Sequence, residues 1–361
     1  MAFTATKREW NELYAFLRLL SEGYVYEGTS GVKRNDEKKY TIAMIEREEH
    51  NGARRYYIEG EHIRVQGNDP IDRFSRNETT GIADNILRAI KSSDENEVES
   101  PDKVEAFLDK IKIYNLKTKT DDRTDIKIAF WNPEAELIGF TINSRLGNMT
   151  PLLDGGRTAN LKFEQVGVKF ASPMVSKINA LESPNEVADR MLLIERMGGQ
   201  LKYTDGADKV FRSNLLMIDL HFPRLLAEMV RTMHLDGITR INELTEAMKR
   251  MNPLKIKEEL IVKHGFYEYK IKQFLNALAR GMRPAKIFNG NHSAIEGILM
   301  IDGKGEVLCY QSRNNPIWED FLFHNTRLEK GPVSKDKYGY LEKENGTLYF
   351  KLNAKIGLTK R

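Results

Sequence analysis

Within residues 124–147 of the chain, hydrophobic side chains occupy every second position along residues 125–130 and again along residues 138–143. Because neighbouring side chains of a β-strand point to opposite faces, the apolar residues of both halves of this stretch fall on one face: Ile126, Ile128, Phe130, Ile138, Phe140 and Ile142. The other face carries Asp125 and Lys127 on the first half, and Thr141 and Asn143 on the second. An Asn-Pro pair between the halves is typical of a turn. The pattern predicts a half-buried β-hairpin.

Helical spacing dominates elsewhere in the chain. Residues 6–22 place their apolar side chains three and four positions apart, and Thr6 followed by Glu9 resembles a capping box. Further helical patterns, most of them ending at glycine or Asn-Pro, cover residues 183–199, 212–237, 238–253 and 267–282. These segments predict a helical middle region.

Strand patterns lie on both sides of that region. Alternating stretches within residues 40–66 predict an antiparallel meander, and strands return from residue 295 onward. An order of strands, then helices, then strands predicts an α+β fold rather than a regular βαβ series. We divide the chain into a core with the hairpin (1–182), a helical part for DNA recognition or dimerisation (183–290), and a β-rich part that packs with the core (291–361).

Composition excludes several classes of protein. No apolar run is long enough to cross a membrane and the first residues lack the apolar stretch of a secretory signal, so we expect a cytoplasmic protein. The single cysteine, Cys309, excludes an internal disulfide and a cysteine-rich zinc site, and the histidines never adopt a metal-ligand spacing such as HExxH. A net charge of +4 permits binding to a polyanion without requiring it.

The polar face of the hairpin has part of the chemistry of a nuclease. Phosphodiester cleavage with metal ions needs closely spaced oxygen ligands, and a nearby lysine helps to offset developing charge. An aspartate on one strand and a Glu-x-Lys pair on the next would supply both, but here the pair is Thr141-x-Asn143, which carries no charge. The alternative is that this face is an ordinary half-exposed sheet surface.

Several segments together resemble the HpaII-type family of type II restriction endonucleases, in order along the chain: residues 7–20, 125–164, 211–229, 270–282 and 337–358. The resemblance implies a bacterial enzyme that binds double-stranded DNA at a short palindrome and cuts it with magnesium. It also implies a nuclease core of the PD-(D/E)XK kind, a mixed sheet flanked by helices. The namesake of the family reads CCGG, which serves only as a guide to the target.

The resemblance also assigns roles to residues of the hairpin. Asp125 matches the metal-binding aspartate of the family, Thr141 falls where a small hydroxyl residue or a carboxylate stands, and Asn143 falls where the lysine stands. Three interpretations of Asn143 remain open. It is a natural replacement, or Lys127 supplies the amine from the neighbouring strand, or the lysine was lost, by nature or through deliberate inactivation.

A second carboxylate for the metal must come from outside the hairpin. We expect Glu12, because related nucleases often bring a glutamate from an N-terminal helix. Glu9 is the alternative, although it can equally serve as the helix cap. Glu164, on the strand expected after the loop, is a third candidate.

Basic residues that follow the hairpin are candidates for DNA contact. Arg145, Arg157 and Lys162 lie in or beside a glycine-rich loop whose backbone amides and side chains can bind phosphates. An ordinary charged surface loop is the alternative. Residues 288–294 and 310–315 are rich in side chains that pair with base edges, and residues 238–253 can form a helix-turn-helix-like insert.

A palindromic target predicts a symmetric homodimer, and a restriction enzyme implies a cognate DNA methyltransferase in the same cell. The leading hypothesis is therefore the restriction endonuclease of a restriction-modification pair. The alternatives are a sequence-specific DNA-binding protein that keeps the nuclease fold without cleaving, and a nuclease of methylated DNA.

Overall fold

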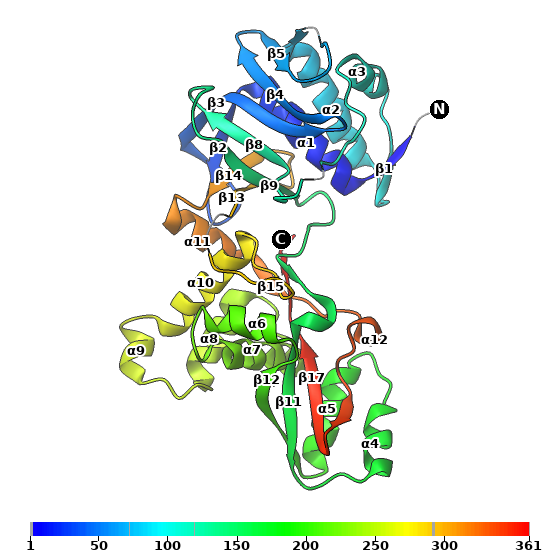
Figure 1. Ribbon diagram of the computed structural model, residues 1–361, viewed down its shortest axis with the longest axis vertical. Coiled ribbons are helices and arrows are strands. Elements are labelled where there is room, and N and C mark those ends of the chain that lie inside the picture. The colour runs from blue at the N-terminus through cyan, green and yellow to red at the C-terminus, as the bar shows by residue number, and fades with distance from the viewer. Residues whose placement is uncertain (1–2, 72, 119, 291–292, 361) are drawn as a thin grey trace. The chain divides into compact units, whose positions relative to one another are not determined.

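The computed structural model describes residues 3–71, 73–118, 120–290 and 293–360 (Figure 1). Their contacts divide the chain into two compact units, one of residues 1–150, 292–321 and 360–361, the other of residues 151–291 and 322–359. Both units combine helices with sheets, so the predicted α+β class is confirmed. Among the described residues, every helix is too short or too polar to cross a bilayer.

Each unit joins segments that are distant in the sequence. The first unit contains β1 (Thr4–Thr6), α1 (Lys7–Glu22), β2 (Tyr24–Gly28), β3 (Arg34–Glu49), β4 (Gly52–Glu59), β5 (His62–Gln66), β6 (Phe74–Ser75), α2 (Arg76–Ser92), β7 (Glu97–Glu99), α3 (Val104–Lys110), β8 (Ile126–Phe130), β9 (Ile138–Ser144), β13 (Ile295–Ile301) and β14 (Val307–Gln311). Helix α11 (Asn315–His324) contributes residues to both units.

The main sheet of the first unit has the strand order β2-β14-β13-β9-β8-β3-β4-β5-β6. Because β2 also pairs with β3, the strands from β2 to β3 in this order close into a ring. The predicted hairpin is β8 and β9, antiparallel, with Ile126 opposite Phe140. The other side of β9 pairs in parallel with β13, and β3 to β6 form the predicted antiparallel meander. Strand β9 therefore lies inside the sheet, where its position is fixed on both sides.

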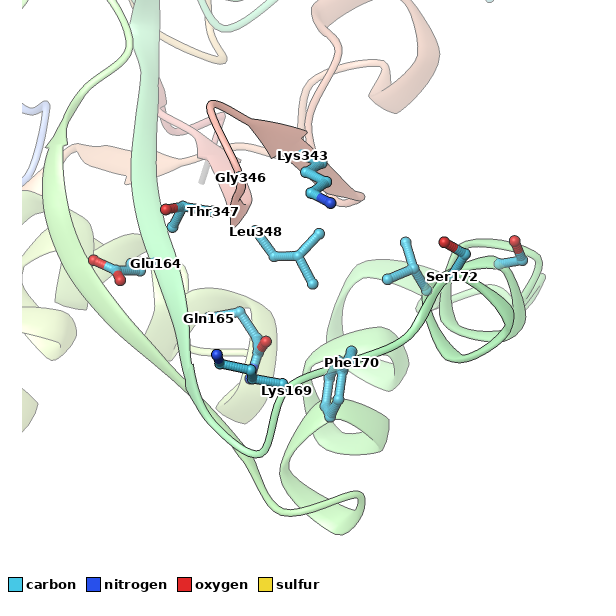
Figure 2. Close-up of a pocket in the computed structure, with 11 residues that line it drawn as sticks. Glu164, Gln165, Lys169, Phe170, Ser172, Lys343, Gly346, Thr347 and Leu348 are labelled. Carbon is cyan, nitrogen blue, oxygen red and sulfur yellow. The ribbon is translucent and has the colours of Figure 1, made fainter.

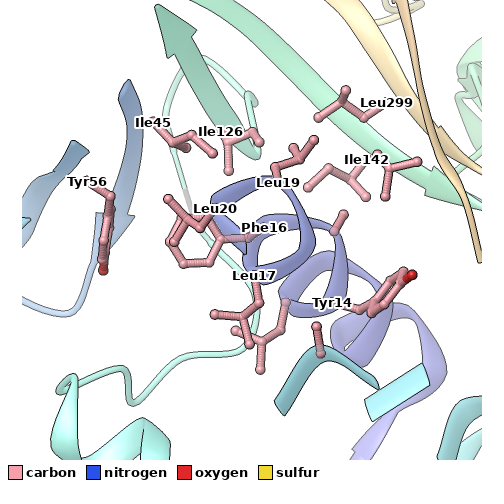
Figure 3. Packing of buried hydrophobic residues seen from close by; sticks show 14 of the residues in the cluster. Tyr14, Phe16, Leu17, Leu19, Leu20, Ile45, Tyr56, Ile126, Ile142 and Leu299 are labelled. Carbon is pink, nitrogen blue, oxygen red and sulfur yellow. The ribbon is translucent and has the colours of Figure 1, made fainter. Parts of the chain in front are cut away.

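Helix α1 packs against this sheet and beside α2 (Figure 1). All the apolar residues of its predicted stripe are buried: Trp10, Leu13, Phe16, Leu17 and Leu20. Figure 3 shows Phe16, Leu17 and Leu20 among side chains from several strands, including Ile126 of β8 and Ile142 of β9. The predicted capping box is present, with the Thr6 amide donating to Glu9 Oε2 over 2.9 Å and the Glu9 amide donating to Thr6 Oγ1 over 3.3 Å. Burial and capping together fix the first turns of α1 against β9.

The second unit contains β10 (Leu153–Asp154), η1 (Gly156–Ala159), β11 (Asn160–Gly167), α4 (Ser172–Asn179), α5 (Glu186–Arg196), β12 (Gly199–Gly206), α6 (Lys209–Leu216), α7 (Phe222–Asp236), α8 (Ile241–Met251), α9 (Glu258–Val262), α10 (Phe266–Ala279), β15 (Thr326–Leu328), α12 (Val333–Asp336), β16 (Leu341–Glu344), β17 (Thr347–Asn353) and β18 (Lys355–Leu358). Its two sheets have the orders β12-β11-β17-β16 and β10-β18-β15. The segment predicted as one helix over residues 212–237 is two helices, α6 and α7, because Pro223 lies in the first turn of α7 and proline is tolerated only at a helix start.

His234 of α7 is expected to make the second unit less stable in acid. The ring is buried against Tyr338, and its Nε2 has no hydrogen-bond partner among the described residues. Burial, aided by the charge of Lys330, lowers the pKa of His234 from 6.5 to about 4. The unfolded chain therefore binds a proton more readily, so stability present above pH 6.5 is lost as the pH falls toward 4. The expected loss is about 3 kcal/mol.

Urea unfolding of the wild type and of His234→Phe at pH 7 and pH 4.5 tests this expectation. The variant cannot titrate at this position, so its stability should fall less between the two pH values than that of the wild type. Equal losses in both proteins would contradict the assignment.

Candidate active site

Asp125 is fixed to the end of the hairpin by its own side chain. Its backbone amide donates to the Phe140 carbonyl over 2.8 Å, and its Oδ2 accepts a hydrogen bond from the Ile142 amide over 2.6 Å. Strand β8 begins at Ile126, which lies opposite Phe140, so β8 offers no backbone partner to the later residues of β9. The Asp125 carboxylate accepts the hydrogen bond of the Ile142 amide instead. The Asp125 carboxylate therefore lies directly beside the backbone that carries Thr141 and Asn143.

Glu12 of α1 is a buried carboxylate, with 4% of its surface exposed. Its Oε1 accepts a hydrogen bond from Nε of Arg8, one turn earlier, over 3.2 Å. Its Oε2 is buried and has no hydrogen-bond partner among the described residues. Leaving a buried charged oxygen without a donor is costly, so this oxygen is suited to bind a cation.

The negative charge of Asp125 acts on Glu12. Burial, followed by the negative charge of Asp125, raises the pKa of Glu12 from 4.5 to about 7. Burial also raises the pKa of Asp125, while the hydrogen bond from Ile142 opposes the rise. A buried carboxylate and a half-buried one that lie close together resist being charged at the same time. A divalent cation between them would remove that conflict.

Asn143 lies near Glu12 in a small pocket. The pocket is lined by Arg8, Asn11, Glu12, Ile142, Asn143, Ser144, Asn148 and Thr150. Asn143 is only 6% exposed, so the prediction that it faces an open side of the hairpin is wrong. Its Oδ1 accepts a hydrogen bond from the Thr150 amide over 3.3 Å, and the neighbouring Ser144 hydroxyl donates to Asn11 Oδ1 over 2.8 Å. These contacts join α1, β9 and the following loop around the two carboxylates.

The oxygen donors of this site fit a magnesium ion. No group of three or more histidine, cysteine, aspartate or glutamate side chains able to hold a metal occurs within the described ranges. Magnesium, however, commonly binds through one or two protein carboxylates and completes its shell with water and substrate phosphate. Asp125 and the unpartnered Oε2 of Glu12 provide that number of carboxylates.

Comparisons with known proteins relate the chain to restriction endonucleases. The sequence profile described as HpaII restriction endonuclease matches residues 6–358. The chain belongs to the HpaII restriction endonuclease family. It is 29% identical over 364 residues, 98% of either chain, to "Type II restriction enzyme HpaII" of Haemophilus parainfluenzae. No solved structure matches the chain. As a member of this family the protein is a site-specific deoxyribonuclease, and the resemblance found in the sequence is confirmed.

Other side chains expected at the site of this HpaII-family enzyme have different partners. Glu9 belongs to the helix cap, where the hydrogen bond from the Thr6 hydroxyl lowers its pKa. Lys127 forms an ion pair with Asp122 over 2.7 Å instead of one with Asp125. Thr141 is half-buried and lies opposite Ile298 of β13 in the sheet.

The residues of this HpaII-family enzyme that were predicted to contact DNA belong to different units. Arg145 follows β9 in the first unit, where its amide donates to the Ile301 carbonyl over 2.9 Å. Arg157 is exposed in η1 of the second unit. Lys162 of β11 pairs with Glu344, and its ammonium lies 3.9 Å from the ring centre of Tyr349.

Glu164, also on β11, belongs to the second unit, whereas the hairpin belongs to the first. It is one of the residues lining a separate pocket formed by β11, the start of α4 and the hairpin of β16 and β17 (Figure 2). The structure therefore assigns Glu164 to the surroundings of this pocket, where Lys343 and Leu348 are also found.

Two cationic residues whose charges act on the carboxylates were not predicted from the sequence. Arg8 precedes Glu12 by four positions, a spacing that places both side chains on one helix face. This ion pair could therefore have been predicted from the sequence. Lys117 lies in the irregular segment between α3 and β8, and its charge acts on both Glu12 and Asp125. No periodic pattern in the sequence relates that segment to the site.

Proposed function

We propose that this HpaII-family chain is a type II restriction endonuclease that hydrolyses double-stranded DNA with magnesium at a short palindromic, CCGG-like site. One observation carries the proposal: the buried Glu12 has an oxygen without a donor and lies close enough to Asp125 for their charges to interact. We assign the hairpin β8–β9, together with β13 and α1, to a nuclease core of the PD-(D/E)XK kind.

Asp125 and Glu12 would hold the metal ion in this proposal, with Asn143 and Thr141 as uncharged neighbours. When bound, magnesium supplies positive charge that stabilises the phosphate in the transition state and promotes ionisation of water. The Ile142 amide orients the Asp125 carboxylate, and Arg8 orients Glu12. Because α1 and β9 are both parts of the packed core, the two carboxylates are held in position before DNA binds.

The reaction is an ordinary hydrolysis of a phosphodiester. The oxygen of water forms a bond to phosphorus, and the bond from phosphorus to the 3′ oxygen breaks. Water loses one proton and the leaving 3′ oxygen gains one, so the products are a 5′-phosphate and a 3′-hydroxyl. Arg8, which lines the pocket beside Glu12, offsets part of the negative charge that gathers there.

For DNA binding we propose Arg145, Arg157 and Lys162 as phosphate contacts. Lys162 would exchange Glu344 for a phosphate. The loss of folding free energy would be small, because partly exposed ion pairs contribute little to stability. The helical part, residues 183–290, would serve recognition or dimerisation. A palindromic target favours a homodimer, acting in the cytoplasm beside a cognate methyltransferase.

Digestion of a sequenced plasmid tests the proposed function. With magnesium we expect discrete fragments whose run-off sequences end at one short palindrome, and with EDTA we expect none. Protection of the plasmid by methylation of that palindrome would support the restriction-modification role. Cutting of methylated plasmid alone would instead identify a nuclease of modified DNA, and intact plasmid with every divalent cation would refute the proposal.

Asn143 favours a second candidate function, a sequence-specific DNA-binding protein that does not cleave, because an amide replaces the charged lysine. Asn143→Lys separates the two functions. If Asn143 is a natural replacement, the wild type already cuts and the variant changes the cleavage rate by less than about tenfold (about 1.4 kcal/mol in the barrier). A wild type that binds DNA without nicking it, together with a variant that cuts cleanly, would establish the second function.

A further inference from the structure

The segment between α3 and β8 is anchored directly beside the candidate active site. Leu116 packs against the hydrophobic core of the first unit. The carbonyls of Asn115 and Leu116 each accept a hydrogen bond from Nη2 of the buried Arg47 over 2.8 Å. Two residues later, the Thr118 hydroxyl donates to the Asp125 carbonyl over 3.1 Å. Lys117 is therefore held between two anchored residues, one of which is bonded to the backbone of Asp125.

The charge of Lys117 acts on both carboxylates, but among the described residues Lys117 forms no ion pair with either of them. Its charge acts on Glu9, Glu12 and Asp125, yet no ion pair or hydrogen bond of its own occurs in the part of the chain that the structure describes. A cation that acts on the buried Glu12 and the half-buried Asp125 but is not bonded to them remains available to a further group, such as a phosphate or a water molecule.

The other cations near the site are already engaged. Lys127 pairs with Asp122 over 2.7 Å, and Arg8 pairs with Glu12 over 3.2 Å. Lys7 donates to the Ser93 carbonyl. Among these cations, Lys117 alone combines an anchored backbone, proximity to both carboxylates and an uncommitted ammonium within the described ranges.

We propose that Lys117 supplies, from outside the hairpin, the ammonium that is missing at position 143, and that it contacts the scissile phosphate and the attacking water. This inference rests on the proposed function. A compact ammonium with three donors can bind a phosphate oxygen and a water molecule at once. Asn143 is then free to hold the Thr150 amide, which explains why an asparagine is compatible with cleavage.

Lys117→Met, with Lys127→Met as the matched control on the hairpin, tests the inference in single-turnover cleavage at saturating DNA. Lys117→Met is expected to lower the rate about 100-fold, which is the usual contribution of one well-placed group. Lys127→Met should lower it less than about threefold. The affinity for the duplex, measured with calcium in place of magnesium, should change less than about fivefold for both variants, because one phosphate contact is a small part of DNA binding.

Two further measurements exclude a merely structural role. Removing a positive charge beside the carboxylates should raise the affinity of the DNA-free protein for Mn²⁺ about threefold to tenfold in Lys117→Met, measured by calorimetry. Treating Lys117→Cys with 2-bromoethylamine rebuilds an amine of nearly the original length and should restore cleavage at least tenfold. The natural Cys309 is fully buried, and burial raises its pKa to about 12, so it should not react.

The possible results separate the inference from the proposed function. If the wild type cuts and Lys117→Met cuts equally well, or if only Lys127→Met fails, the inference is wrong and the proposed function stands. If aminoethylation of Lys117→Cys restores nothing, the role of the amine is refuted. If the wild type does not cut DNA in the same assay, the proposed function and the inference fall together.

Discussion

Asp125→Asn is expected to lower the single-turnover cleavage rate by about 1000-fold, or about 4 kcal/mol in the barrier. The substitution removes the negative charge that the metal ion requires but preserves the shape of the side chain. The amide oxygen of asparagine can still accept the hydrogen bond from Ile142, so the end of the hairpin should remain folded. The melting temperature should therefore stay within a few degrees of that of the wild type.

Asp122→Asn is the matched control for this substitution. Asp122 lies three residues earlier on the same segment and pairs with Lys127 over 2.7 Å. Asp125 is among the charges that act most on Glu12, whereas Asp122 is not. It should retain cleavage within about tenfold of the wild type. An Asp125→Asn variant that cuts at the wild-type rate would remove Asp125 from the active site.

Glu12→Gln should abolish cleavage and, at the same time, stabilise the metal-free protein at alkaline pH. The folded pKa of Glu12 is raised to about 7, whereas the reference value for an unfolded chain is 4.5. The protonated carboxyl therefore contributes stability below pH 4.5, and that contribution is lost as the pH rises through 7. The loss amounts to at most about 3 kcal/mol. Glutamine keeps the neutral form at every pH, so the variant should escape the loss.

Thermal unfolding in EDTA at pH 5 and pH 8 measures this effect. The variant should melt at a temperature similar to that of the wild type at pH 5, and several degrees higher at pH 8. Added magnesium should stabilise the wild type and not the variant. Glu9→Gln serves as the control, because Glu9 belongs to the helix cap and should be dispensable for cleavage. A Glu12→Gln variant that is less stable than the wild type at pH 8, or that cleaves DNA, would contradict the account.

Local periodicity was sufficient to predict the elements that build the site. The alternation of apolar residues gave the hairpin and its buried face, and the spacing in residues 6–22 gave α1 with its capping box. These features depend on interactions between residues that are close in the sequence, so their pattern is visible in a single chain. Placing Glu12 near Asp125 required the family resemblance, because no local pattern relates α1 to the hairpin.

Features that depend on distant segments could not be predicted. The parallel pairing of β9 with β13 joins strands more than a hundred residues apart, and it helps to bury the end of β9 where Asn143 lies. Lys117 lies in a segment without helical or strand periodicity, which the hydrogen bonds made by Arg47 and Thr118 anchor beside Asp125. The break between α6 and α7 was missed although Pro223 marked it, because the apolar spacing continued on both sides.

In the proposed mechanism, Asp125 and Glu12 together hold a divalent cation at the end of β9. Crystals grown with Mn²⁺ allow this cation to be located by anomalous diffraction. We expect a manganese peak within about 2.2 Å of an Asp125 oxygen and of Glu12 Oε2, and the loss of that peak in Asp125→Asn. Manganese bound elsewhere, with Glu12 Oε2 still lacking any partner, would contradict this mechanism.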